Sequence, residues 1–86
     1  MSKQILKVRI LSPQKLIFQG EAISVSSTNS QGKFDILPQH ANFITMVKDM
    51  PIIIMPITNK QRPLIYKFPL AIIYNFSNLV NIYTGI

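Results

Sequence analysis

Apolar and polar residues alternate with a period of two along most of the chain, the pattern of half-buried β-strands. In the first such stretch, Leu6, Val8 and Ile10 alternate with Lys7 and Arg9. Helix is not expected, because Ile, Val, Thr and aromatic residues dominate while Ala, Glu and Leu are sparse. The pattern predicts short strands over residues 6–10, 16–18, 22–27, 34–36, 43–47, 52–57, 64–68, 71–76 and 79–84.

Turn-forming residues separate these strands. The sequence predicts that Gly20 forms a turn or bulge, and that residues 28–32 form a loop, because Asn and Gly accept the positive φ of a tight turn. A hairpin loop is predicted over residues 59–63 and a last turn at Ser77-Asn78. About 8–10 short strands with turn signals every 8–12 residues or so predict an all-β fold, a small β-sandwich or flattened barrel.

The uninterrupted apolar run at residues 52–57 is typical of a strand that is covered on both faces. On an uncovered sheet edge it would favour aggregation, which Pro51 and Pro56 could limit. A partner subunit could instead cover the run, since exposed apolar surface commonly marks an interface. Both interpretations are open at this point.

The length of 86 residues indicates one domain, 1–86, and its 48% apolar residues are enough for a core. The absence of cysteine excludes disulfides and thiolate metal sites. No apolar run approaches the roughly 20 residues that span a bilayer, and the N-terminus does not resemble a secretory signal. We therefore expect a protein made without export, in the cytoplasm.

The net charge of +6 arises from nine Lys and Arg residues against Glu21, Asp35 and Asp49. Such a charge suits nucleic acid, an anionic lipid surface or an acidic partner. The basic residues are scattered, mostly at alternate strand positions or in turns, where solvated side chains belong. Tyr66-Lys67-Phe68 comes closest to a nucleic-acid stacking surface, but two core-facing aromatics beside a solvated lysine explain it better. We therefore expect no nucleic-acid partner.

His40 is the single histidine and the first candidate for chemistry. With three dispersed acids and no cysteine it cannot assemble an ordinary zinc site. Pairing with Asp35 is conceivable, yet no nucleophile accompanies the pair. The glycines lie too far apart to cradle a phosphate. We therefore expect no catalytic residue, metal or cofactor, and we interpret the segment around His40 as a shaped docking corner.

Two segments carry a family resemblance. Residues 18–21 read Phe-Gln-Gly-Glu, and residues 32–42 read Gly-Lys-Phe-Asp-Ile-Leu-Pro-Gln-His-Ala-Asn. In composition and separation they resemble the N-terminal domain of the epsilon subunit of F-type ATP synthases, which is called delta in mitochondria. The resemblance covers most of residues 5–48, and residues 78–83 are similar to a later strand of the family.

The resemblance implies a β-sandwich without an active site, at the foot of the rotating central stalk. There it would join the gamma subunit to the membrane c-ring, so that ion-driven rotation of the ring turns gamma. The implied location is peripheral, on the cytoplasmic face of an energy-transducing membrane or in the equivalent organelle compartment. The implied gamma contacts are Pro38, Gln39, His40, Ala41, Asn42 and Phe43, and the implied c-ring contacts are Gln31, Gly32 and Lys33.

The chain also departs from the family pattern. Asp35 and Gln39 replace glycines and Asn42 replaces a proline, so the backbone of the corner is expected to differ. Lys33 stands where many relatives carry an acid. The sequence ends at Ile86, where relatives commonly add a helical hairpin that restrains ATP hydrolysis, so we expect a coupling subunit without that brake. The alternative function is a free-standing β-barrel module that binds nucleic acid or an acidic partner.

Overall fold

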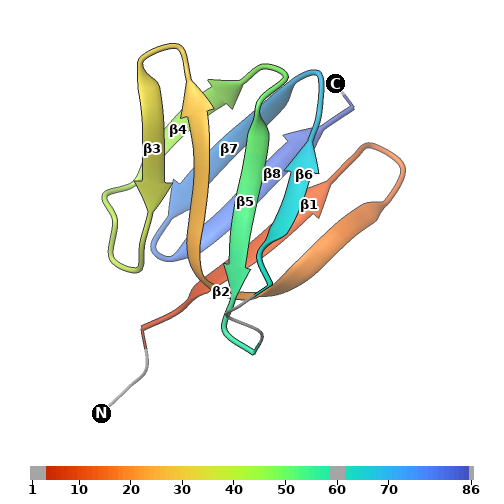
Figure 1. Ribbon diagram of the computed structural model, residues 1–86. Coiled ribbons are helices and arrows are strands. Elements are labelled where there is room, and N and C mark those ends of the chain that lie inside the picture. The colour runs from red at the N-terminus through yellow and green to blue at the C-terminus, as the bar shows by residue number, and fades with distance from the viewer. Residues whose placement is uncertain (1–3, 59–61, 86) are drawn as a thin grey trace.

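The computed structural model describes residues 4–58 and 62–85, which fold entirely as strands and connecting turns (Figure 1). Within these residues there is no helix, so the predicted all-β class is confirmed. The strands are β1 (Leu6–Leu11), β2 (Leu16–Asn29), β3 (Gly32–Ile36), β4 (Phe43–Val47), β5 (Pro51–Pro56), β6 (Leu64–Lys67), β7 (Ala71–Phe76) and β8 (Leu79–Thr84).

The long strand β2 belongs to both layers of a sandwich. Its first half pairs with β1, and its second half lies between β3 and β5. One layer therefore has the order β4-β7-β8-β1 and ends on the first half of β2, while β3, the second half of β2, β5 and β6 form the other. Figure 1 shows the two layers facing each other. The pairings are antiparallel except that of β1 with β8, which is parallel.

The core lies between the layers and consists of aliphatic side chains from alternate strand positions. Burying one such side chain stabilises the fold by about 1.5–3 kcal/mol. Tyr66 and Phe68 pack against this core while Lys67 between them is exposed, as the sequence predicts. The buried aliphatic residues larger than alanine are Leu6, Val8, Ile10, Val25, Ile36, Val47, Ile52, Ile54, Ile73, Val80 and Ile82.

The predicted turn or bulge at Gly20 is wrong, because β2 runs through this residue. Gly20 lies opposite Val8 of β1 in a continuous register. A Cβ placed on Gly20 would lie 2.9 Å from Cζ of the Phe18 ring. The glycine therefore makes room for an aromatic ring within the strand, and the register shift of β2 against β5 lies further on, between Ala22 and Ser24.

The loop predicted over residues 28–32 is shorter in the structure. Strand β2 continues to Asn29 and β3 begins at its partner Gly32, which leaves Ser30 and Gln31 as the turn. Gly32 has a φ of 121°, which residues with a side chain rarely adopt. The hairpin loop predicted over 59–63 falls partly on residues 59–61, which lie outside the described residues.

The apolar run in β5 is covered on one face by this chain, so the prediction of cover on both faces is wrong. Ile52 and Ile54 are buried, whereas Ile53 points outward and is 36% exposed. Strand β5 lies between β2 and β6, so it is not a sheet edge. The hazard of edge-to-edge pairing is therefore removed by strand order.

Candidate functional site

The segment between β3 and β4, residues 37–42, forms an exposed turn that we call the docking corner. The His40 N–H donates to the Leu37 carbonyl at 3.0 Å, which closes the turn. Gln39 adopts a φ of 69°, the left-handed conformation that a glycine would take more easily. The rings of His40 and Phe43 lie 5.0 Å apart. The imidazole therefore rests on the first side chain of β4.

A buried asparagine on β7 holds this corner from below. Asn75 is 1% exposed, and its Nδ2 donates to the carbonyls of Ala41 at 3.1 Å and of His40 at 3.4 Å. Within the described residues its Oδ1 has no hydrogen-bond partner. A polar side chain buried in a largely aliphatic interior is costly unless it makes hydrogen bonds. Its place in the core is therefore explained by the corner that it supports.

The β7–β8 turn, Ser77-Asn78, holds the corner from the side. The Gln39 N–H donates to Oδ1 of Asn78 at 2.6 Å, and the Ser77 N–H donates to Oδ1 of Asn42 at 2.8 Å. Both turn residues have positive φ, as a two-residue hairpin requires, which confirms the predicted turn. The corner and this turn, about 35 residues apart in the sequence, thus form one exposed unit.

The outer side of β4, β7 and β8 is apolar and exposed. The register places Ile44 beside Tyr74, and Phe76 beside Leu79, on the side of the layer that faces away from the core. Ile44 is 64% exposed and Phe76 is 50% exposed. Contiguous apolar surface of this kind typically marks an interaction site. We call it the apolar outer face; its apolar residues are Ile44, Met46, Ile72, Tyr74, Phe76, Leu79 and Tyr83, and the half-buried Asn81 lies among them, opposite Tyr74.

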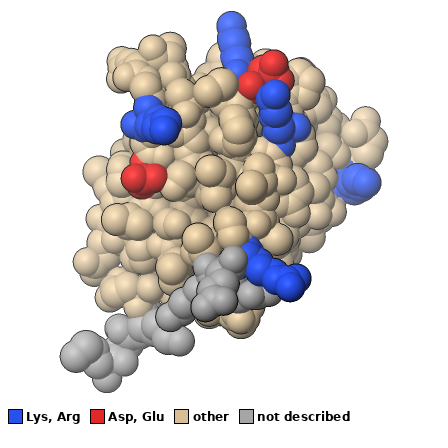
Figure 2. Space-filling view, in the orientation of Figure 1, with Lys and Arg blue, Asp and Glu red and all other residues tan. Residues whose placement is uncertain are grey.

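Basic residues border the apolar outer face on one side. In the parallel pairing of β1 with β8, Lys7 lies beside Leu79 and Arg9 lies beside Asn81. Both basic side chains are exposed. Figure 2, in the orientation of Figure 1, shows the opposite side of the molecule, over β3, β5 and β6, where charged side chains are scattered over a mostly uncharged surface.

The residues expected at the c-ring lie at the opposite end of β3 from the docking corner (Figure 1). Gln31, Gly32 and Lys33 are all exposed. Strand β3 contributes five residues, which extend about 15 Å at the usual rise of a strand. The structure therefore brings each predicted set together as a patch and separates the two patches along one strand.

Sequence reasoning missed the apolar outer face and the side chains that hold the corner. One signal was present in β7, where Ile72, Tyr74 and Phe76 alternate with Ala71, Ile73 and Asn75. Both faces of such a strand carry large apolar residues, which a solvated outer face does not need. Because the polar Asn75 lies on the buried face of β7, the pattern of polar and apolar residues alone predicts the wrong face as the buried one.

The described part of the chain contains no group of three or more His, Cys, Asp or Glu residues placed to hold a metal ion. Over the same ranges, no helix is long and apolar enough to cross a membrane. Lys67 and Asp49, 3.7 Å apart, form the one ion pair among the described residues.

Three comparisons with known proteins agree. Residues 5–66 match the family described as ATP synthase, Delta/Epsilon chain, beta-sandwich domain. The ATP synthase epsilon chain of a Nitratiruptor species is 42% identical over 43 residues, which cover 50% of this chain and 33% of that relative. The epsilon chain of Sulfurimonas denitrificans is 42% identical over 48 residues, covering 56% and 35%.

Solved structures share the fold. A chain of the Euglena gracilis mitochondrial ATP synthase, solved with its c-ring, superposes with a TM-score of 0.84 at 12% identity, over 98% of this chain and 52% of that chain. A chain of the Tetrahymena thermophila mitochondrial central stalk and c-ring gives a TM-score of 0.74 at 16% identity, over 98% and 66%. The matched region thus spans about a third of the curated relatives.

Proposed function

Because the chain belongs to the family of the β-sandwich domain of ATP synthase delta and epsilon chains, we propose that it is a non-catalytic subunit of the central stalk of an F-type ATP synthase. In this role it docks the gamma subunit to the c-ring and supports the coupling of ion translocation to ATP synthesis. It associates with the membrane peripherally, through the complex, on the cytoplasmic face or in the equivalent organelle compartment.

One observation carries the proposal for gamma: the docking corner is fastened to the turn that borders an exposed apolar sheet face. The buried Asn75 and the β7–β8 turn fix the backbone of the corner before any partner arrives. Preorganisation of this kind lowers the entropy cost of binding. The gamma contact therefore comprises Pro38, Gln39, His40, Ala41, Asn42 and Phe43, and continues across the apolar outer face.

The c-ring contact is assigned to Gln31, Gly32 and Lys33 at the other end of β3. Support comes from the separation of the two patches, because a subunit that joins two partners must present two surfaces that both can reach. The strand between the patches is paired within the sandwich, so the distance between them is fixed by backbone hydrogen bonds.

The gamma assignment is tested by mixing this chain with the gamma subunit of the same organism and measuring complex formation by size exclusion and calorimetry. We expect a stable complex that His40→Ala and Ile44→Ser each weaken while the circular dichroism spectrum is unchanged. Lys15→Ala, in the exposed β1–β2 connection far from the corner, is the matched control. Failure of the unmodified chain to bind gamma would refute the proposal.

A second candidate function is a sheet that binds single-stranded nucleic acid. The observation that favours it is the set of exposed aromatics Tyr74, Phe76 and Tyr83 on the face that Lys7 and Arg9 border. Tyr74 and Phe76 stack with ring centroids 6.3 Å apart. Aromatic platforms with nearby cations bind single strands, with affinity that falls steeply with salt. Retention of a labelled oligonucleotide at low salt, lost in Tyr74→Ala, would support this candidate.

A further inference from the structure

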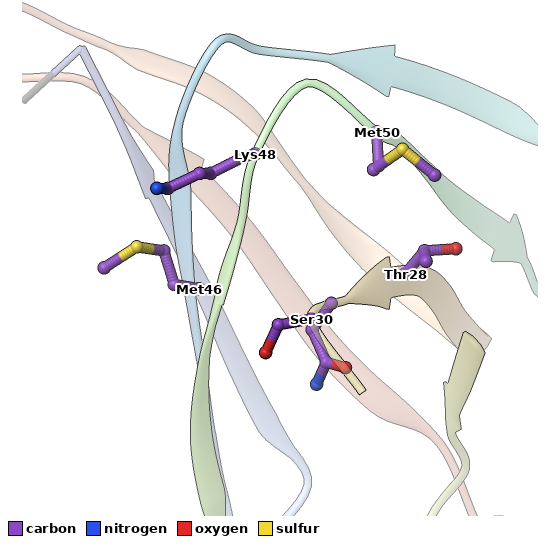
Figure 3. Close-up of a pocket in the computed structure, with 6 residues that line it drawn as sticks. Thr28, Ser30, Met46, Lys48 and Met50 are labelled. Carbon is purple, nitrogen blue, oxygen red and sulfur yellow. The ribbon is translucent and has the colours of Figure 1, made fainter. Parts of the chain in front are cut away.

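Four connections between strands meet at the end of the sandwich opposite the docking corner (Figure 1). They join β1 to β2, β2 to β3, β4 to β5 and β6 to β7, through residues 12–15, 30–31, 48–50 and 68–70. Figure 3 shows Lys48 and Met50 on the β4–β5 connection, across an open pocket from Ser30 of the β2–β3 turn. We call this the lysine end, because each connection carries an exposed lysine or lies within two residues of one: Lys15, Lys33, Lys48 and Lys67.

Hydrogen bonds hold these connections in place. The Asp49 N–H donates to the carbonyls of Phe68 and Pro69, each at 3.1 Å, which joins the β4–β5 connection to the β6–β7 connection. In the β1–β2 connection the Ser12 N–H donates to the Lys15 carbonyl at 2.9 Å. Residues of the β1–β2 and β6–β7 connections line one shared depression, so these two connections are also neighbours. The lysines are therefore spread over one surface whose backbone is fixed before any partner arrives.

The lysine end carries an excess of positive charge. Asp49 is the one acidic residue in the four connections, and it lies 3.7 Å from the Lys67 ammonium group. Both side chains of this pair are more than half exposed, and an exposed ion pair contributes little. Within the described residues no ion pair is formed by Lys15, Lys33 or Lys48. These three lysines are therefore available to an anionic partner.

Exposed apolar side chains accompany the lysines. Leu16, directly after the β1–β2 connection, is 48% exposed, and Met50 is 37% exposed. Pro13 and Pro69 are exposed as well. The one aromatic residue of the four connections, Phe68, packs against the core, so these connections present no ring on which a nucleic-acid base could stack. Lysines beside exposed apolar side chains suit the headgroup region of a bilayer better than they suit nucleic acid.

We propose that the lysine end binds directly to a bilayer surface that contains anionic phospholipids. The lysines contact phosphate groups, and Leu16 and Met50 lie between the headgroups. This goes beyond the proposed function, in which the membrane is reached through the complex. It rests on the proposed function in one respect, since Gln31, Gly32 and Lys33, assigned to the c-ring, belong to the same end. Each lysine near an anionic surface strengthens binding about fivefold, an attraction that salt screens.

The test is co-sedimentation of the chain with vesicles of equal parts phosphatidylcholine and phosphatidylglycerol, and with vesicles of phosphatidylcholine alone. The lysine-end variant is Lys15→Gln with Lys48→Gln, neither of which is assigned to gamma or to the ring. The matched control, Lys7→Gln with Arg62→Gln, removes the same charge at the opposite end of β1 and in the β5–β6 loop. We expect the unmodified chain to bind only the mixed vesicles, less tightly as salt is added. The lysine-end variant should bind about 20-fold more weakly, and the control within about twofold.

A separate variant tests the apolar contribution. Leu16→Ser should weaken binding to the mixed vesicles about fivefold, because a half-exposed leucine gains further apolar burial at the bilayer. An unchanged affinity would overturn the apolar part of the proposal. Thermal unfolding checks that each variant folds.

Three outcomes would overturn the proposal as a whole. The first is no binding of the unmodified chain to the mixed vesicles. The second is equal weakening in the lysine-end variant and the control, which would show attraction by net charge alone. The third is binding of a labelled single-stranded oligonucleotide that depends on Lys15 and Lys48, without vesicle binding, which would favour nucleic acid.

Gamma binding by size exclusion, measured on the same proteins, separates this inference from the proposed function. If the chain binds gamma but not the mixed vesicles, the lipid contact is refuted and the central-stalk function stands. If the chain binds the mixed vesicles through the lysine end but does not bind gamma, the proposed function fails and the lipid contact stands.

Discussion

Asn75 offers a direct test of whether the docking corner is held by the sheet beneath it. Its Nδ2 donates to two carbonyls of the corner, Ala41 at 3.1 Å and His40 at 3.4 Å. Asn75→Ala removes both hydrogen bonds and leaves the strands of the core in place. We therefore expect a local loosening of the corner together with a moderate loss of global stability.

The magnitude follows from opposing contributions. Each lost hydrogen bond costs about 0.5–1.5 kcal/mol net, with the 3.4 Å bond at the lower end. The small cavity left by the carboxamide adds to this cost. Removal of Oδ1, which is buried without a partner among the described residues, offsets part of it. We expect about 1.5 kcal/mol in total, which lowers the melting temperature of a chain this short by roughly 6–12 °C.

Asn75→Asp separates the loss of the donors from the loss of volume. The carboxylate is nearly isosteric with the amide, but it faces two carbonyl oxygens with no donor and would be charged inside the core. We expect this variant to be destabilised by about 3 kcal/mol or more, well beyond the alanine variant. An aspartate variant that is more stable than the alanine variant would show that packing, and not hydrogen bonding, explains Asn75.

Two measurements are needed. Thermal unfolding followed by circular dichroism gives the global effect, and amide hydrogen exchange by NMR gives the local one. The N–H groups of Gln39 and Ser77, which are bonded to Asn78 and Asn42, should exchange faster in Asn75→Ala. Asn81→Ala on the neighbouring strand is the matched control, because Asn81 lies opposite Tyr74 and away from the corner. If Asn75→Ala melts earlier while exchange at Gln39 and Ser77 is unchanged, the corner does not depend on Asn75.

Three further substitutions test other parts of the structure. Gln39→Gly should stabilise the fold by about 0.5 kcal/mol in urea unfolding. Relief of the left-handed backbone conformation gains about 1–2 kcal/mol, which exceeds the entropy cost of glycine, about 0.5–1 kcal/mol. A loss of stability would show that Gln39 is not strained. Ile82→Ala, in the core, should cost about 2–5 kcal/mol in the same assay, and a value below about 1 would argue against a packed interior. Phe76→Ser should change stability by about 0.5 kcal/mol or less and yet weaken gamma binding; a large drop in stability would place Phe76 in the core.

The strands were predictable because one face of each is buried and the other is not. Leu6, Val8 and Ile10 alternate with basic residues, and this difference is visible in the sequence itself. The prediction of a turn or bulge at Gly20 was wrong because the role of this glycine depends on the position of the Phe18 ring. The prediction that the apolar run of β5 is covered on both faces was wrong for a related reason, because any cover over Ile53 would have to come from outside the sheet.

The candidate site was predictable only in part. The docking corner is contiguous in the sequence, so its residues could be assigned through the family resemblance. Its supports are not contiguous: Asn75 bonds to a carbonyl 34 residues earlier, and Asn78 to an N–H 39 residues earlier. Those pairs depend on β7 lying beside β4, and strand order cannot be read from the period of hydrophobic residues. The apolar outer face also depends on strand order, because its residues form one surface only when β4, β7 and β8 lie side by side.

The two surfaces proposed for gamma meet on β4. Phe43 at its first position follows the docking corner directly, and Ile44 and Met46 contribute to the apolar outer face. Every residue of β4 pairs with β7, whose Asn75 supports the corner. A force that gamma applies at the corner therefore acts on a paired strand and not on a free loop. Stiffness at this surface then comes from the ladder of backbone hydrogen bonds between β4 and β7.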